Sequence, residues 1–235
     1  MEEELSPSAI IPTPAPKKKR WFKRWWGITI IVFILLTIVF AAVLIFQIYA
    51  LINNPENEVS DLKVYDVSAD NDPYLGSPDA KVKIIAFEDF ECPFCGEAFS
   101  IIRELTSTYG DQIQFVFRDF PIVENHPNAP KAHEAAECAN AQGKFWQMHD
   151  KLYQNQENLS VADLKQFAIG IGLDAKSFDT CLDSGRFAAE IEKDRTDGIA
   201  VDVRGTPTWF LNGYRIEGVV PLEDFKALID LLLAN

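Results

Sequence analysis

The feature that most constrains the fold of this chain is a cysteine pair that directly follows an apolar run. Residues 84–87 form that run, within a predicted buried strand over residues 82–87, and residues 88–91 link it to the first cysteine. Cys92-Pro93-Phe94-Cys95 comes next, and apolar residues then recur at helical spacing at Phe99, Ile102 and Leu105. The pattern predicts a strand that leads into a helix, with both cysteines on the first turn of that helix.

The start of a helix suits a reactive cysteine. Pro93 fits the first helical position, because the N–H that it lacks would have no partner there. Unpaired backbone N–H groups and the positive end of the helix dipole stabilise an anion at Cys92, which lowers the pKa of its thiol. Cys95 lies three residues on, on the same face, where it can close a disulfide with Cys92 or resolve a mixed one. Cys92 is therefore the candidate exposed nucleophile, and Cys95 is its resolving partner.

Three other interpretations of the bare pair stay open. Two cysteines at this spacing can form half of a zinc site, although the sequence has no second Cys-x-x-Cys and no His-x-x-x-His pair. They can also form a small structural bridge or remain inert buried thiols. The predicted strand and helix around the pair favour redox chemistry, because that context distinguishes a redox motif from the others.

A long uncharged segment indicates the compartment. Residues 27–52 are apolar except for Thr29, Thr37 and Gln47. About 20 residues of helix span the hydrocarbon core of a bilayer, so this segment is long enough to cross one. Its length and the lack of an Ala-x-Ala-like site favour a retained anchor over a cleaved signal peptide.

A basic block precedes the apolar segment and holds six of the 22 lysines and arginines. Its members are Lys17, Lys18, Lys19, Arg20, Lys23 and Arg24. The positive-inside rule places this end in the cytoplasm and everything after residue 52 outside it. The formal net charge is −13, and the part after residue 52 is strongly acidic. That part would repel phosphate, so a nucleic-acid partner is not expected.

The chain divides into four predicted parts. Residues 1–26 form a cytoplasmic tail with the basic block, residues 27–52 the transmembrane anchor, and residues 53–71 a polar juxtamembrane linker. Residues 72–235 form the folded domain. Its predicted elements run β-α-β with parallel strands, then an all-helical insertion at about residues 127–200, then β-β-α.

This order, with Cys-Pro-Phe-Cys after the first buried strand, resembles the DsbA-like thiol:disulfide oxidoreductases, in particular their membrane-anchored branch. The resemblance covers essentially all of residues 72–235. It implies an α/β thioredoxin fold, a central mixed β-sheet flanked by helices, with an inserted all-helical subdomain and one transmembrane helix before it. The stretches that carry it are Asp72–Ala80, Phe87–Cys95, Gly143-Lys144-Phe145-Trp146 and Gly205-Thr206-Pro207-Thr208.

The resemblance also implies a substrate-binding position. Pro207 matches a proline that is cis in thioredoxin-like folds and faces the active-site disulfide. The Thr206 backbone before it would then pair with an extended substrate. An ordinary trans proline at the start of a strand is the alternative.

The sequence departs from the family at one position. Many relatives carry a buried acid six residues before the nucleophile, thought to exchange protons with the buried cysteine, and this chain has Ala86 there. Glu88 is the candidate substitute. Asp89 belongs to the family's own pattern, and strand alternation predicts that one of these two acids points away from the core. We expect Glu88, together with Pro93 and Phe94, to tune the redox chemistry of the pair.

Two further cysteines, Cys138 and Cys181, lie in separate predicted helices of the insertion. All four cysteines fall in the predicted extracytoplasmic part, and an even count there is what two disulfides need. Some relatives have a bridge at matching places, so the resemblance favours a structural Cys138–Cys181 disulfide over two free thiols. No metal site is expected, because the three histidines show no ligand spacing.

The expected function is that of a membrane-anchored protein-disulfide oxidoreductase that forms disulfides in exported proteins. The Cys92–Cys95 pair would do this without a dissociable cofactor. By resemblance, a quinone-linked membrane thiol oxidase would reoxidise the pair, and the chain would act as a monomer on extracytoplasmic proteins. The alternatives are a disulfide reductase or isomerase fed with electrons across the membrane, a module that binds and delivers copper or zinc, and a non-catalytic scaffold.

Overall fold

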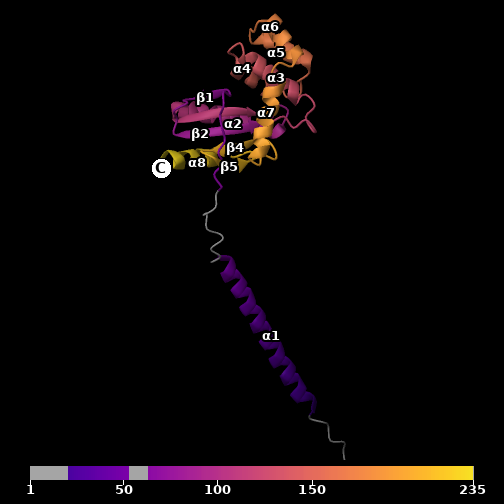
Figure 1. Ribbon diagram of the computed structural model, residues 1–235. Coiled ribbons are helices and arrows are strands. Elements are labelled where there is room, and N and C mark those ends of the chain that lie inside the picture. The colour runs from indigo at the N-terminus through magenta and orange to yellow at the C-terminus, as the bar shows by residue number, and fades with distance from the viewer. Residues whose placement is uncertain (1–20, 53–62, 235) are drawn as a thin grey trace, which may run out of the picture. The chain divides into compact units, whose positions relative to one another are not determined.

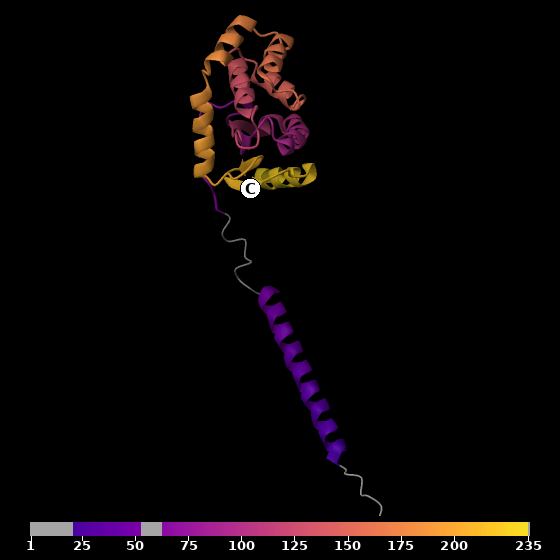
Figure 2. The ribbon, with the colours of Figure 1, turned by 90° about the vertical axis from the view of Figure 1, so that its right-hand side faces the viewer.

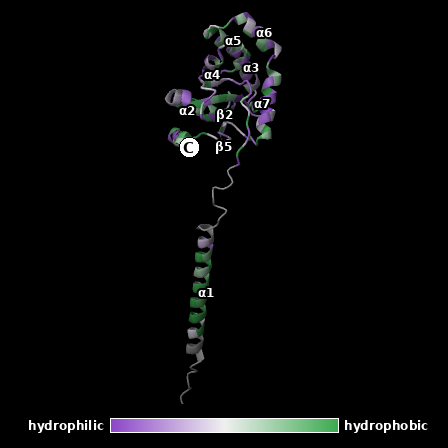
Figure 3. Cartoon of the chain, turned by 60° about the vertical axis from the view of Figure 1, so that its left-hand side comes forward, coloured by the Kyte–Doolittle hydropathy of each residue, from purple (hydrophilic) through white to green (hydrophobic). Residues whose placement is uncertain are grey.

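The computed structural model describes residues 21–52 and 63–234, which belong to two compact units divided near residue 61. The first unit contains α1 (Trp21–Ile52), a helix of 32 residues. Its stretch Trp26–Gln47 is long and apolar enough to cross a membrane (Figure 3). The predicted anchor is therefore present as a candidate membrane-spanning helix. The predicted tail up to residue 20 and residues 53–62 of the predicted linker lie outside the described residues.

The second unit is built on a five-stranded mixed sheet with the strand order β1-β3-β2-β4-β5 (Figure 1). The strands are β1 (Tyr74–Gly76), β2 (Val82–Glu88), β3 (Ile113–Asp119), β4 (Thr208–Leu211) and β5 (Tyr214–Glu217). β2 and β3 are parallel, and the other neighbouring pairs are antiparallel. β2 lies at the centre and is buried on both faces, which accounts for its nearly continuous apolar sequence.

Different elements cover the two faces of this sheet. Helices α2 (Pro93–Tyr109) and α8 (Leu222–Ala234) pack on one face, with buried side chains such as Leu105 and Phe225. On the other face lie Ile85, Phe87 and Phe210, where residues 65–69 and the end of α7 pack against them. The predicted thioredoxin fold is confirmed.

The insertion contains five helices that gather beyond the sheet, and the last of them runs back to it (Figure 2). They are α3 (Ala129–Asn140), α4 (Phe145–Tyr153), α5 (Val161–Gly170), α6 (Ala175–Ser184) and α7 (Ala188–Ala200). Ser160 and Asp163 form a capping box at the start of α5, and Asp174 caps α6. These short-range signals place the helices close to where the sequence predicts them.

The predicted boundary at residue 72 is wrong, because residues 63–71 belong to the folded domain rather than to the linker. Val64 forms a β-bridge with Tyr214, and the Tyr65 N–H donates to the Gly213 carbonyl at 2.9 Å. Apolar side chains alternate along this segment at Tyr65, Val67 and Ala69 and cover the second face of the sheet. Polar residues lie between them, so the composition of the segment is that of a linker even though its apolar side chains are packed.

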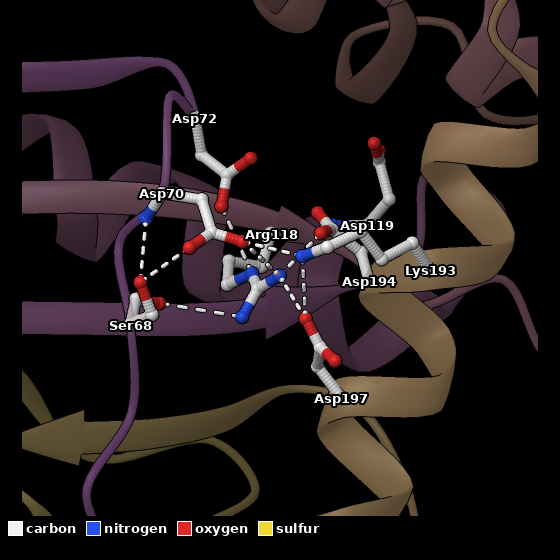
Figure 4. Close-up of polar contacts among 8 residues, drawn as sticks. All are labelled: Ser68, Asp70, Asp72, Arg118, Asp119, Lys193, Asp194 and Asp197. Atoms are coloured by element: carbon white, nitrogen blue, oxygen red, sulfur yellow. Dashed lines mark hydrogen bonds and ion pairs between the residues drawn. The ribbon is translucent and has the colours of Figure 1, made fainter.

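Arg118 of β3 holds the same segment in place from inside the domain (Figure 4). Only 1% of its side chain is exposed, and its Nε lies 2.9 Å from Oδ2 of Asp72. Its Nη2 forms ion pairs with Asp194 and Asp197 of α7, the latter at 2.9 Å, and its Nη1 donates to the Ser68 carbonyl at 3.3 Å. One buried guanidinium therefore joins the segment before β1, strand β3 and helix α7.

Candidate active site

The cysteine pair lies where the central strand β2 passes into α2. Cys92 is the N-cap residue of α2, and Pro93 occupies the first turn. The Gly96 N–H donates to the Cys92 carbonyl at 3.1 Å and closes that turn. Both thiols are free, and Cys95 faces the core with no exposed surface. The predicted strand, turn and helix around the pair are confirmed.

The expectation of an exposed Cys92 is wrong, since only 4% of this residue is accessible. Its Sγ donates to the carbonyl oxygen of Thr206 at 3.3 Å, and its side chain packs in the apolar cluster that contains Phe90 and Tyr153. Phe94, in contrast, is 60% exposed. A substrate that approaches the pair therefore finds a large apolar side chain beside a recessed sulfur.

The two thiols differ strongly in acidity. Hydrogen bonds that stabilise the thiolate form, from the Cys95 thiol, then from the Thr206 hydroxyl and the backbone N–H groups of Cys95 and Phe94, lower the pKa of Cys92 to about 5 against the opposing effect of burial. Burial raises the pKa of Cys95 well above its usual range, and the charges of Cys92 and Glu88 add to that rise. The reduced pair therefore holds one thiolate and one thiol at neutral pH.

The loop before β4 forms the wall next to Cys92. The Thr206–Pro207 peptide is cis, in agreement with the expectation from the family resemblance. The Thr206 carbonyl accepts the Cys92 thiol, while its hydroxyl is buried and has no partner among the described residues in this geometry. The hydroxyl is thus free to donate to a Cys92 thiolate. Pairing of the Thr206 backbone with a substrate stays a prediction.

Glu88 at the end of β2 is a buried acid close to the pair, with 2% of the residue exposed. The Tyr153 hydroxyl donates to its carboxyl at 2.5 Å. Burial, with a smaller effect of negative charge at Cys92, raises the pKa of Glu88 to about 8, against the Tyr153 hydrogen bond, which lowers it. Ala86 lies two residues before it and therefore faces the same side of the sheet. Glu88 thus supplies a buried acid on the face where the family pattern would place one at Ala86.

Asp89 is buried as well, so the prediction that either Glu88 or Asp89 points away from the core is wrong. The insertion and the segment before it cover the side of the strand that alternation would leave open. Oδ2 of Asp89 accepts from the Ile122 N–H at 2.7 Å and lies 2.8 Å from Nδ1 of His126. The acids therefore belong to one loop that is enclosed on both sides.

Glu91 connects this loop directly to the first helix of the insertion. Its carboxylate accepts the backbone N–H groups of Asn128 and Ala129 at 2.7 and 2.9 Å. These groups lie at the start of α3, where a carboxylate satisfies unpaired donors and the helix dipole. Together with the Tyr153–Glu88 hydrogen bond, this contact holds residues 88–91 in place against the insertion.

The other two cysteines form a disulfide between α3 and α6, with a Cα–Cα distance of 5.9 Å between Cys138 and Cys181. They lie in the cluster that forms the core of the insertion, which agrees with a structural role. Among residues 21–52 and 63–234, no group of three or more histidine, cysteine or acidic side chains could hold a metal ion.

Sequence patterns gave no sign of two residues at the site, Tyr153 and Gln156. Both come from the end of α4 and the turn after it, and Gln156 lies 64 residues after Cys92. An aromatic or amide residue after an amphipathic helix is too common to indicate a site. The contacts depend on how the insertion folds back over the loop, which no short-range pattern encodes.

Residues 68–231 match the protein family described as thioredoxin, which is more than half of the chain. The chain therefore belongs to the thioredoxin family, and it has the fold of the DsbA-like thiol-disulfide oxidoreductases. BdbD from Bacillus subtilis superimposes with a TM-score of 0.66 at 24% identity, over 73% of this chain and 98% of BdbD. Alpha-DsbA1 from Wolbachia pipientis gives a TM-score of 0.62 at 20% identity, over 70% and 92% of the two chains.

Longer proteins carry a similar stretch of sequence. The Na(+)/H(+) antiporter NhaA 1 of Mycobacterium sp. (strain KMS) is 35% identical over 167 residues, which are 70% of this chain and 27% of the antiporter. The chain thus spans about a quarter of the length of such curated relatives. The name Na(+)/H(+) antiporter is given to those longer proteins as a whole.

Proposed function

We propose that this chain is a protein-disulfide oxidase that acts outside the cytoplasm. The observation that supports it best is the asymmetry of the pair, because the pKa of Cys92 falls to about 5 while that of Cys95 rises. Groups that stabilise the Cys92 thiolate stabilise the reduced form of the enzyme. A pair whose reduced form is stabilised is a stronger oxidant.

Oxidation of a substrate takes two exchange steps. A substrate thiolate attacks the Cys92 sulfur, the Cys92–Cys95 bond breaks, and Cys95 leaves as a thiolate that takes up a proton. A second substrate thiolate then attacks the substrate sulfur of the mixed disulfide, and Cys92 leaves as a thiolate. The substrate dithiol loses two electrons and two protons. The pair takes both electrons, one proton ends on Cys95, and the other goes to solvent.

Glu88 is placed to supply the proton that Cys95 takes up. Burial raises the pKa of Glu88 to about 8, so its carboxyl carries a proton near neutral pH. A negative charge at Glu88 would oppose the Cys95 thiolate, since the two groups interact electrostatically. Cys95 has the higher pKa of the two groups. Transfer of the proton from Glu88 to Cys95 therefore removes the less stable anion, the Cys95 thiolate. The Tyr153 hydroxyl holds the carboxyl in place.

The compartment and the partners belong to the same proposal. α1 would anchor the chain in the cell membrane with the N-terminus in the cytoplasm, as the basic block favours. The substrates would be exported proteins, and a quinone-linked membrane thiol oxidase would restore the Cys92–Cys95 disulfide. The chain would act as a monomer, and the redox group would be the cysteine pair itself.

Two features favour the alternative of a reductase or isomerase. The side chain of Phe94, inside the pair, offers neither a hydrogen-bond donor nor a positive charge to a Cys92 thiolate, and Glu91 beside the pair carries a negative charge. Both would limit the oxidising power of the disulfide. We therefore expect a potential that is moderately rather than strongly oxidising.

The reduction potential of the Cys92–Cys95 pair tests the direction of electron flow. We expect a value between about −270 mV, as in thioredoxin, and about −120 mV, as in DsbA. The purified protein would be equilibrated in glutathione buffers and its redox state read by mass spectrometry, with Cys95→Ser as a control that cannot close the pair. A potential at or below the thioredoxin value, with slow oxidation of a reduced model protein, would decide for the reductase.

A further inference from the structure

The side chain of Gln156 reaches from the turn after α4 into the active-site loop. Its Nε2 donates to the Phe90 carbonyl at 2.9 Å and to the Cys92 carbonyl at 2.8 Å. A side-chain amide nitrogen carries two hydrogens, so both are used on the backbone of this loop. The contact is therefore made to the N-cap residue of α2 and to the residue two positions before it.

Gly96 is what allows the amide to come this close. A Cβ at position 96 would lie 2.1 Å from Oε1 of Gln156 and 2.8 Å from its Cδ. The Gly96 N–H donates to the same Cys92 carbonyl that Gln156 contacts. The amide thus lies directly against the first turn of α2, at a position that no other residue type leaves open.

The turn that carries Gln156 is itself held in place. The Asn155 N–H donates to the Leu152 carbonyl at 3.0 Å, and the Asn155 side chain donates to the Lys151 carbonyl at 2.7 Å. Tyr153, at the end of the same helix, holds Glu88. One end of α4 therefore contacts both the backbone at Cys92 and the acid near Cys95.

The geometry points to Gln156 as a positioning residue for disulfide exchange. We infer that it fixes the carbonyl of Cys92 so that the backbone N–H groups of Phe94 and Cys95 stay directed at the Cys92 sulfur. Gln156 touches neither sulfur, and it acts through the N-cap of α2. The inference rests on the exchange chemistry at Cys92 proposed above, and it assigns to the insertion a direct part in that chemistry.

Gln156→Met tests this role, because methionine has a similar length and no donor. At pH 5 we expect the alkylation rate of Cys92 in the reduced protein to fall by about three- to tenfold, since a smaller fraction is thiolate. At pH 8 the rates should be nearly equal, because both proteins are then ionised. A tenfold smaller equilibrium constant for reduction of the pair by glutathione would correspond to about 30 mV. Gln154→Met, at an exposed position two residues earlier, is the matched control and should match wild type.

A second variant tests the contact from the other side. Gly96→Ala should displace the amide and shift the pH profile in the same direction. In a Gln156→Ala protein, the same change at Gly96 should add little, because the amide that it displaces is already gone.

Two results would overturn the inference. One is a Gln156→Met protein with the pH profile and potential of wild type, and the other is loss of stability to urea with no change in either. Alkylation reads the Cys92 thiolate and not oxidase activity. A wild-type protein that fails to oxidise substrates would therefore refute the proposed function. The role of Gln156 would still be decided by the alkylation rates and the potential.

Discussion

Thr206 has two roles at the residue scale, and the protonation state of Cys92 selects between them. In the thiol form, the sulfur donates to the Thr206 carbonyl oxygen at 3.3 Å. In the thiolate form, the sulfur can only accept, and the buried hydroxyl of Thr206 becomes its donor. Ionisation of Cys92 therefore satisfies a hydroxyl that is otherwise buried without a partner, which favours the thiolate.

Thr206→Val removes this hydroxyl and keeps the shape of the side chain. A hydrogen bond to a charged group contributes roughly 1.5–3 kcal/mol, so the pKa of Cys92 should rise by about one unit or more. Absorbance of the thiolate at 240 nm, followed against pH, measures the change. Thr208→Val is the control, because the Thr208 hydroxyl donates to the Gly205 carbonyl at 2.7 Å and not to sulfur. An unchanged titration in Thr206→Val would exclude the hydroxyl as a donor.

The low pKa of Cys92 also makes the stability of the reduced protein depend on pH. The pKa of Cys92 is lower in the folded, reduced protein than in an unfolded chain, so its contribution is fully present above the unfolded pKa. It is lost as the pH falls through about 5. The reduced protein should therefore gain stability over the oxidised protein as the pH rises from 5 towards 9. That gain should be smaller in Thr206→Val.

At the scale of elements, local patterns predicted more than contacts between distant segments. β2, α2 and β3 could be predicted because their signals are local: an apolar run in β2, helical spacing and Pro93 in α2, and alternation in β3. β1 was missed, since its three residues read as a turn until they pair with β3. The domain boundary was placed at residue 72, although Val64, Tyr65 and Val67 could supply a short edge strand, because the sheet face that residues 63–71 cover exists only in the folded chain. The site divides in the same way: the cysteine pair is local, whereas Tyr153 and Gln156 reach it only through the fold.

Arg118→Met tests the buried ion pairs that join residues 68–72 to β3 and α7. The change leaves the Asp194 carboxylate buried without its cation and removes the partner of Asp72, whose pKa burial raises to about 8; breaking a buried pair in this way typically costs about 3–5 kcal/mol. Urea unfolding measures the loss. Arg195→Met is the control on α7, because its ion pairs with Glu192 and Glu124 have exposed partners and should contribute roughly 0–1 kcal/mol.

Removal of the stranded charges distinguishes this explanation from simple loss of packing. Asp72→Asn and Asp194→Asn, added to Arg118→Met, should recover part of the lost free energy of unfolding. A loss below about 1 kcal/mol in Arg118→Met itself would contradict the role of this ion pair, since exposed pairs already reach that value.

At the scale of the whole molecule, the two units differ in how far their apolar residues are buried. The folded domain has clusters around β2, around the insertion and under residues 65–69. Along the described side chains of α1, large apolar residues such as Phe33 and Phe46 are 69% and 70% exposed. An apolar surface of this length is unfavourable in water and favourable in a bilayer. The exposed apolar surface of α1 thus supports the membrane anchor that we propose.

The orientation that we propose for α1 rests on the basic block before residue 27 and can be tested on intact cells. Protease added outside should digest the chain beyond residue 52 and leave a tag at the N-terminus protected, because the positive-inside rule keeps Lys17–Arg24 in the cytoplasm. Replacing the six basic residues by glutamine should lower the protected fraction, since no other lysine or arginine precedes the apolar segment 27–52. Glutamine in place of Lys63, Lys81 and Lys83, in the domain, is the matched control and should leave protection unchanged. Digestion of the N-terminal tag in wild type, with an intact domain, would place the cysteine pair in the reducing cytoplasm and remove the basis for an oxidase.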